Sequence, residues 1–214
     1  QRIEANGNEK AYQEALKNLQ RALVIDSKSM HAFLQMSELY REMSELDEDD
    51  SKLDLATLVL TQGQLIEGEK GEDFPAFNLT LGLLKMERGD IIGALKNFKA
   101  AYEKDDELFE AYMNYGAITI GFRGYADAEM VFSRALELEP DNYAAHLNLG
   151  VAKRGLEKYD EAESEYKKAM EIEPNTPDAY YNMGLLYQDY RFDKAGESGY
   201  ENFEEAIKWY KDFK

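Results

Sequence analysis

The sequence predicts an all-α protein: a solenoid of repeated helical units, with about 11 helices. Residues 109–142 and 143–176 repeat one pattern at a step of 34 residues. Small residues recur at fixed places in that pattern, as Gly116 and Gly150 do. A period of this length with small residues at fixed positions is typical of helical repeat arrays. No stretch of the chain forms a convincing strand.

The two copies match at many positions. The same residue type recurs 34 positions after each of Ala111, Asn114, Gly116, Tyr125, Ala128, Ala135 and Pro140. This pattern resembles the tetratricopeptide repeat (TPR), whose unit is a pair of antiparallel helices. The resemblance implies that these pairs stack into a right-handed superhelical array. The resemblance implies a binding architecture and leaves the partner open. Small residues such as Ala128 would let the two helices of a unit approach closely, and aromatic residues such as Phe132 would fill the remaining gaps.

We interpret residues 1–214 as a single array. From Pro75 onwards the repeats follow one another without a gap. Their ranges are residues 75–108, 109–142 and 143–176, which are regular, and 177–214, which carries an insertion at about 189–202.

The N-terminal part fits the pattern more loosely. Residues 30–68 form a divergent repeat in which Ser37 takes the glycine position and an acidic insertion, residues 44–51, separates the two helices. Residues 10–27 are predicted to be the lone second helix of a partial repeat, with Gln1 to Glu4 as the frayed end of its partner helix. Neither end of the chain shows the polar cap that terminal repeats normally need. We therefore expect a piece of a longer array or of a larger protein.

The chain is strongly acidic, with 43 acidic residues against 25 basic ones and a formal net charge of -18. Such a surface repels phosphate backbones and anionic headgroups, which argues against nucleic acid and against direct membrane insertion. No apolar run approaches the ~18 residues of a membrane span. We expect a soluble protein of the cytoplasm or periplasm, and the general character of the repeats suggests a bacterial source.

No chemistry-bearing motif emerges. The absence of cysteine excludes disulfides and cysteine-ligated zinc, and His31 and His146 are too few for a histidine-rich metal site. The acidic run from Asp47 to Asp50 lacks the glycine and glutamate of an EF-hand. We expect no catalytic residue, no metal and no cofactor, and therefore no enzyme.

A binding surface is predicted on the first helix of each repeat, on the face away from the packing residues. The TPR resemblance implies that this face lines a concave groove. In the divergent repeat it carries Leu34, Gln35 and Glu38. In the later repeats it carries Leu79, Thr80, Leu83 and Met86; Met113, Asn114, Ala117 and Ile120; Leu147, Asn148, Val151 and Arg154; and Tyr181, Asn182, Leu185 and Gln188.

Two features of this face bear on function. Asn114, Asn148 and Asn182 form a ladder of amides one repeat apart, and an amide can pair with a peptide unit whatever its side chain. The alternative is that these asparagines follow the family consensus and bond locally. The apolar residues beside the ladder favour a partner segment, although a tight superhelix or a segment of the same chain would also cover them.

We therefore predict a protein-protein interaction module that binds an apolar or amphipathic segment of a partner protein, with or without basic residues flanking that segment. An acidic peptide tail is a poor fit, because Met113, Leu147 and Tyr181 stand where a clamp for such tails needs lysine. One alternative is a structural scaffold, for example in a bacterial envelope or motility assembly, that uses its ends and insertions. Another is the recruiting arm of a larger enzyme.

The insertion near the C-terminus carries a hypothesis of its own. Tyr190, Arg191, Phe192 and Tyr200 make it too aromatic for a plain linker. Because insertions in repeat proteins often lie on a binding face, we predict that it touches the groove or a neighbouring subunit.

Overall fold

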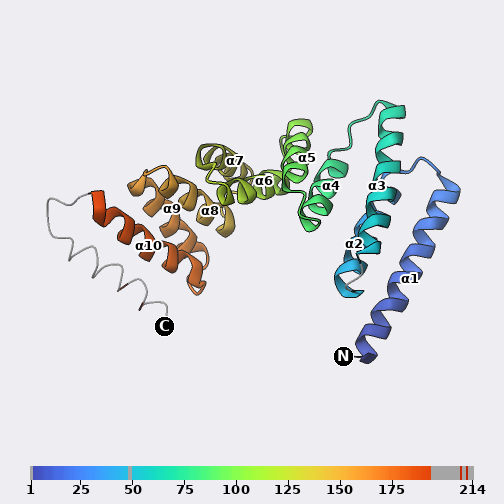
Figure 1. Ribbon diagram of the computed structural model, residues 1–214, viewed down its shortest axis with the longest axis horizontal. Helices are drawn as coiled ribbons and strands as arrows, with labels where there is room; N and C mark the ends of the chain where they lie inside the picture. The colour runs from blue at the N-terminus through green and yellow to red at the C-terminus, as the bar shows by residue number, and fades with distance from the viewer. Residues whose placement is uncertain (1, 48–49, 194–207, 209–210, 212–214) are drawn as a thin grey trace. The chain divides into compact units, whose positions relative to one another are not determined.

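A computed structural model describes residues 2–47, 50–193, 208 and 211, with the side chains of 10–46, 50–188, 208 and 211. Every regular element in these residues is an α-helix (Figure 1). They belong to two compact units, residues 1–108 and 109–214. The all-helical fold predicted from the repeat pattern is confirmed.

Unit 1 holds five helices: α1 (Arg2–Ile25), α2 (Met30–Asp47), α3 (Ser51–Lys70), α4 (Pro75–Glu87) and α5 (Ile91–Lys104). Consecutive helices pack as α1 on α2, α2 on α3 and α4 on α5, and α4 also contacts both α2 and α3. Its core is a buried cluster that includes Leu53, Leu60, Phe77 and Leu84.

Unit 2 continues with α6 (Phe109–Gly121), α7 (Tyr125–Leu138), α8 (Tyr143–Gly155), α9 (Tyr159–Ile172) and α10 (Pro177–Asp193). α6 pairs with α7 and α8 with α9, while α8 also contacts α6, α7 and α10. α8 therefore packs on its own second helix and on both neighbouring repeats, which is how repeats share a core that none could bury alone.

Glycines on the first helices explain the close packing of the regular repeats. A Cβ atom added to Gly82 or to Gly116 would lie 2.5 Å from the ring of Phe98 or of Phe132. At Gly150 an added Cβ would overlap the ring of Tyr166 in the same way. This is the contact between a small residue and an aromatic one that the sequence pattern predicts.

The divergent repeat packs differently. Ser37 of α2 is buried and its hydroxyl donates to Ala56 O of α3 at 2.9 Å. Gly63 lies on the second helix, α3, and a Cβ atom added there would lie 2.6 Å from the ring of Phe77 and 3.0 Å from Phe33 Cβ. Here the glycine stands on the second helix, and its aromatic neighbours come from α2 and α4.

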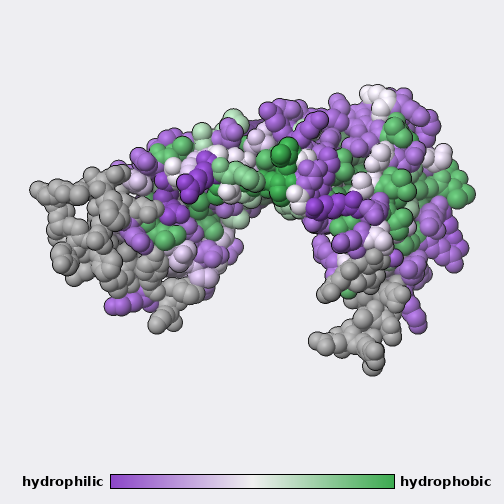
Figure 2. All heavy atoms as spheres, in the orientation of Figure 1, coloured by the Kyte–Doolittle hydropathy of each residue, from purple (hydrophilic) through white to green (hydrophobic). Residues whose placement is uncertain are grey.

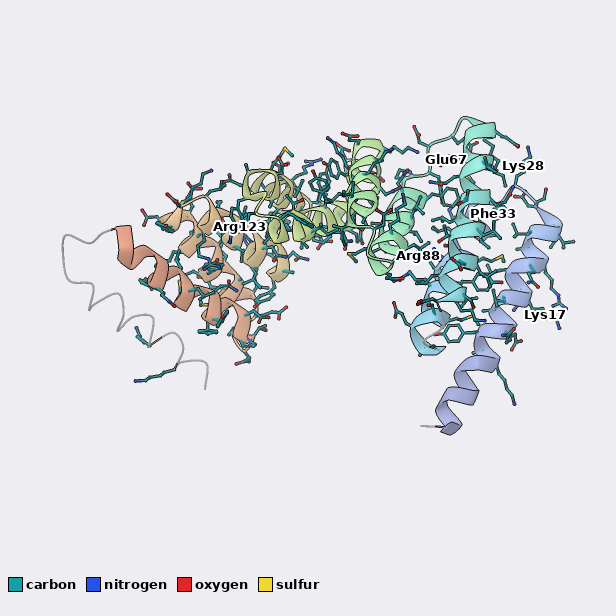
Figure 3. All side chains as sticks on the ribbon, in the orientation of Figure 1. Lys17, Lys28, Phe33, Glu67, Arg88 and Arg123 are labelled. Atoms are coloured by element: carbon teal, nitrogen blue, oxygen red, sulfur yellow. The ribbon has the colours of Figure 1, made fainter. Side chains whose placement is uncertain are left out.

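The turns between α4 and α5, α6 and α7, and α8 and α9 share one conformation. Gly89, Arg123 and Glu157, one repeat apart, have φ of 75°, 60° and 63°. The residue after each donates a hydrogen bond to a carbonyl five residues earlier, as Gly124 N does to Thr119 O at 2.9 Å, which is the Schellman arrangement. Figure 3 labels Arg123 at the turn from α6 to α7. Glycine adopts this conformation freely, whereas arginine and glutamate are strained in it.

Helix lengths differ from the sequence interpretation in three places. α1 is one continuous helix from Arg2 to Ile25 where a second helix with a separate fragment before it was predicted. α2 runs to Asp47, so the first half of the predicted acidic insertion is helical. α10 runs to Asp193, into the insertion predicted from residue 189. No proline interrupts any of these stretches, and residues 44–47 and 189–193 also lack glycine, so nothing local ends the helices. Of the predicted eleventh helix, only Lys208 and Lys211 belong to the described residues, and both are helical.

Candidate peptide-binding surface

The first helices of unit 2 lie next to one another, because α8 contacts both α6 and α10. Their residues from the predicted groove form a surface that we call the amide face. It comprises Met113, Asn114, Ala117 and Ile120 of α6, Leu147, Asn148, Val151 and Arg154 of α8, and Tyr181, Asn182, Leu185 and Gln188 of α10.

The three asparagines of this face are half-buried, and two of them bond to their own helices. Asn114 Nδ2 donates to Glu110 O, and Asn182 Nδ2 donates to Asp178 O, both at 2.8 Å. Such a bond to the preceding turn holds the amide in one orientation. It uses one of the two N–H donors and leaves Oδ1 and the second N–H for another partner.

The apolar residues of the face divide into two groups. Met113 and Ile120 pack against the core between α7 and α8, and Leu147 and Val151 pack against the core around α9 and α10. These half-buried side chains already cover part of their surface against neighbouring helices. Tyr181, which is 55% exposed, presents a larger apolar surface to a partner. Ala117 and Gln188 are also exposed, and Leu185 and Arg154 are half-buried.

In unit 1 the corresponding residues lie on α2 and α4, which contact each other. Leu79, Leu83 and Met86 are half-buried on α4. Thr80, in the ladder position, is only 3% exposed and hydrogen-bonds to Glu38 of α2. It therefore offers little to a ligand.

This part of unit 1 is more polar than the amide face. Gln35 Nε2 donates to Glu38 Oε2 at 2.7 Å, and Arg41 Nη1 donates to Glu87 Oε1 at 2.9 Å. Burial raises the pKa of the Glu38 carboxyl and outweighs the opposing effect of Arg41. Because Glu42 also repels the charge on Glu38, a basic group would be favourable beside these carboxylates.

Residues of the predicted insertion are described only in part. Tyr190, Arg191 and Phe192 belong to the last turns of α10, but their side chains lie outside the described residues, as does all of Tyr200.

Unit 2 also contains a hollow. It encloses about 700 Å³ between α7, α8 and α9, and its lining includes Leu136, His146, Leu149, Lys153 and Glu165. His146 Nε2 donates to Pro140 O at 2.9 Å, since a carbonyl only accepts, and Nδ1 lies 2.7 Å from Glu165 Oε2.

Lysines complete this buried cluster. Lys153 Nζ lies 3.1 Å from Glu165 Oε1 and 3.3 Å from Glu161 Oε2, and Lys168 Nζ lies 3.4 Å from Glu165 Oε2. Burial alone would raise the pKa of Glu165, but the bonds from His146 and Lys153 outweigh burial and lower it. Burial would lower the pKa of Lys153, and its bonds to Glu165 and Glu161 raise it instead.

Sequence reasoning identified His146 as a core or interface residue but missed Glu165. The signal was present, since Asn97 and Val131 occupy the same repeat position and Glu165 is the only ionisable one of the three. A carboxylate in a buried position needs partners, and His146 and Lys153 on α8 supply them. The cluster ties α8 to α9 and to the loop before α8.

None of the described helices is both long and apolar enough to span a membrane. Among the same residues, no group of three histidine, aspartate or glutamate side chains is arranged to hold a metal ion.

Comparison with known proteins supports the same fold. The family model described as the TPR repeat matches residues 153–189, which run from the end of α8 through α9 into α10. No curated protein matches the chain.

Solved structures match most of the chain. One is YrrB, described as a TPR protein with an unusual peptide-binding site, at 18% identity over 91% of this chain and 93% of that chain, with a TM-score of 0.70. Another is the MamA protein, at 21% identity over 84% of this chain and 90% of that chain, with a TM-score of 0.64. A third is residues 41 to the end of MamA from Desulfovibrio magneticus RS-1, at 19% identity over 82% and 96%, with a TM-score of 0.63. At these identities the likeness shows the fold.

Proposed function

Because the chain has the fold of a tetratricopeptide repeat array and carries a matching TPR repeat, we propose that it is a non-catalytic protein-interaction module. Its amide face would hold an extended segment of a partner protein. TPR arrays generally serve as interaction modules, and a neighbour of similar fold, YrrB, is described as having a peptide-binding site.

The observation that carries the proposal is the repeated orientation of the asparagine amides. Asn114 and Asn182 make the same bond to their own helix two repeats apart, so their remaining donor and acceptor groups are offered in the same way. An extended peptide offers a donor and an acceptor at each peptide unit. A row of like-oriented amides therefore suits a backbone and is indifferent to its sequence.

Side-chain preference would come from the residues around the ladder. Tyr181, exposed on α10, offers an aromatic ring to an apolar side chain of the partner. Met113 and Val151 offer smaller apolar surfaces, since both are half-buried. The formal net charge of -18 favours a partner segment with basic flanks.

The first experiment is a selection of peptides from a random display library against the full chain, followed by anisotropy titrations with a selected peptide. The triple variant Asn114→Ala, Asn148→Ala, Asn182→Ala should lose at least tenfold in affinity. Asn97→Ala is the matched control, because Asn97 Nδ2 makes the same kind of bond, to Gly93 O at 2.7 Å, on a second helix.

Circular dichroism would establish that both variants remain helical before binding is compared. Peptides that bind the triple variant as well as they bind the wild type would contradict the proposal. The asparagines would then serve only local packing.

A further inference from the structure

The outward side of α3 in unit 1 carries exposed leucines. Leu58 is 67% exposed, Leu65 60% and Leu55 39%. In the view of Figure 2, hydrophobic residues gather over α3 amid a largely hydrophilic surface. We call residues Leu55, Leu58, Gln62 and Leu65 the leucine strip. Their spacing of three, four and three residues puts them on one side of the helix.

The repeat itself does not call for leucine at these positions. The buried residues align α3 with α5 at an offset of 38 positions. Ala56, Leu60 and Gly63 are buried on α3, and the residues 38 positions later, Ala94, Phe98 and Ala101, are buried on α5.

In that alignment the leucine strip falls on positions that the regular repeats fill mostly with polar or charged residues. Leu58 corresponds to Lys96, Met130 and Ser164, and Leu65 corresponds to Glu103, Glu137 and Glu171. All six of these residues are exposed. Leucine at an exposed position gives the array no packing, so a surface contact explains it better.

The strip is also free of exposed charge. From Leu55 to Gly68 the exposed residues are Leu55, Leu58, Thr61, Gln62, Leu65 and Gly68. The one carboxylate in this stretch, Glu67, is buried, and it accepts from Lys104 Nζ at 2.6 Å and from Phe74 N at 2.9 Å. Exposed charges flank this stretch, with Asp50 and Asp54 before it and with Glu69, which is paired with Lys28, and Lys70 after it.

We propose that a second copy of this chain covers the leucine strip, with the two α3 helices antiparallel about a twofold axis near Leu60. This alignment sets Leu55 against Leu65 of the second copy and Leu58 against its Gln62. It also brings Lys70 to the level of Asp50 of the second copy and Glu69 to the level of its Ser51, so like charges do not meet at the ends. A parallel pairing would set Lys70 against Lys70 and Asp50 against Asp50, which repel.

An uncharged strip is the part of an acidic surface where two copies repel least. Two chains of net charge -18 repel each other less strongly where their facing surfaces carry no like charges. The contact is only one helix wide and falls below the standard interface of about 800 Å² per partner. The dimer should therefore be weak and depend on concentration.

The test is analytical ultracentrifugation of the full chain over a wide concentration series. The wild type should rise towards twice its monomer mass, and the variant Leu58→Glu, Leu65→Glu should stay monomeric. Met130→Glu is the matched control, because Met130 occupies the position of Leu58 on α7 and is 58% exposed; it should behave as the wild type does. A wild type that stays monomeric throughout, or a double variant that still dimerises, would overturn the proposal.

Crosslinking tests the antiparallel geometry without charge substitutions. The chain has no cysteine, so single cysteines can be introduced cleanly. At 1.5 Å per residue, two copies of residue 62 lie roughly 6 Å apart along the axis, whereas two copies of residue 65 lie roughly 15 Å apart.

A short bismaleimide should therefore join Gln62→Cys chains efficiently and leave Leu65→Cys chains mostly unlinked. The double variant Leu55→Cys, Leu65→Cys should be joined again. Equal crosslinking of Gln62→Cys and Leu65→Cys would mean a parallel pairing and would overturn the proposed geometry.

Discussion

In the regular helix pair α8–α9, Gly150 of the first helix lies under the ring of Tyr166 from the second helix. In the divergent pair α2–α3 the glycine is on the second helix, where Gly63 lies under Phe77 of the following helix α4. Ser37 takes the place of Gly150 and bonds to Ala56 O instead of meeting a ring.

This difference teaches that the array needs one close contact between a small residue and an aromatic ring, but either helix can provide the glycine. A change of side chains at the contact leaves the buried positions Ala56 and Leu60 in register with those of the regular repeats. The outward face is then free to diverge. On α3 it carries the leucine strip, whereas the regular pair α8–α9 differs from its neighbours at buried positions, where Glu165 of α9 pairs with His146 of α8.

Breaking the buried pair of His146 and Glu165 should produce the largest change in the free energy of unfolding. Glu165→Ala leaves His146 and Lys153 buried without their carboxylate, so the free energy of unfolding should fall by roughly 3 kcal/mol or more. Urea unfolding followed by circular dichroism measures this. The variant Glu165→Val, His146→Tyr places the residues of the preceding repeat, Val131 and Tyr112, in both positions and should recover much of the loss. A double variant no better than Glu165→Ala would contradict this account.

The same pair predicts a pH dependence. The folded-state pKa of Glu165 is lowered, chiefly by its bonds to His146 and Lys153 against the effect of burial. Its contribution is therefore complete above the unfolded pKa of about 4.3 and is lost as pH falls through the lower folded pKa. The stability gap between wild type and Glu165→Gln should be widest near neutral pH and shrink below about pH 4. A gap that stays constant into strong acid would contradict the assignment.

The glycine–ring contact should produce the next largest effect. Gly116→Ala puts a Cβ atom 2.5 Å from the Phe132 ring, and we expect a loss of about 1–3 kcal/mol in the free energy of unfolding. Gly121→Ala on the same helix is the control, because nothing lies within 4 Å of the added atom; its stability should stay equal or rise by up to about 1 kcal/mol. Equal losses at Gly116 and Gly121 would show that the ring contact is not the cause.

In the divergent repeat, replacing Ser37 by the glycine of the regular pattern should not raise the stability of the fold. Ser37→Gly removes the bond from the Ser37 hydroxyl to Ala56 O and adds backbone freedom, so stability should fall by about 1–2 kcal/mol. Ser37→Ala should lose about 1 kcal/mol through the hydrogen bond alone. Thermal unfolding of both variants checks this, and a more stable Ser37→Gly protein would mean that α2–α3 packs as the regular repeats do.

The turn residues should give the smallest effect, with the sign reversed. Glu157 has φ of 63°, which glycine adopts without strain, so Glu157→Gly should raise stability by up to about 1 kcal/mol. At the equivalent turn, Gly89→Ala should lower it by a similar amount. Differential scanning calorimetry of the pair measures both shifts, and two shifts of the same sign would argue against strain as their origin.

The regular repeats could be predicted from sequence because small and aromatic residues recur 34 residues apart. The contact of Gly63 with Phe77 could not be predicted, since it joins α3 to α4 and has no counterpart at that step. The lengths of α2 and α10 were misjudged because acidic or aromatic composition suggested insertions where no residue ends a helix.

The candidate site could also be predicted from the sequence only in part. Helical spacing put Asn114, Asn148 and Asn182 on one face, but it could not show that the amides of Asn114 and Asn182 bond to the preceding turn. It also could not show that Thr80 is buried, because the covering residue Glu38 comes from another repeat.

The most direct test of the amide face is a titration of the ¹⁵N-labelled chain with a selected peptide, followed through the asparagine side-chain signals in NMR spectra. We expect the amide signals of Asn114, Asn148 and Asn182 to shift together on binding, while those of Asn97 on α5 stay in place. A peptide that binds while the three ladder signals remain still would contradict the claim that this face holds the partner's backbone.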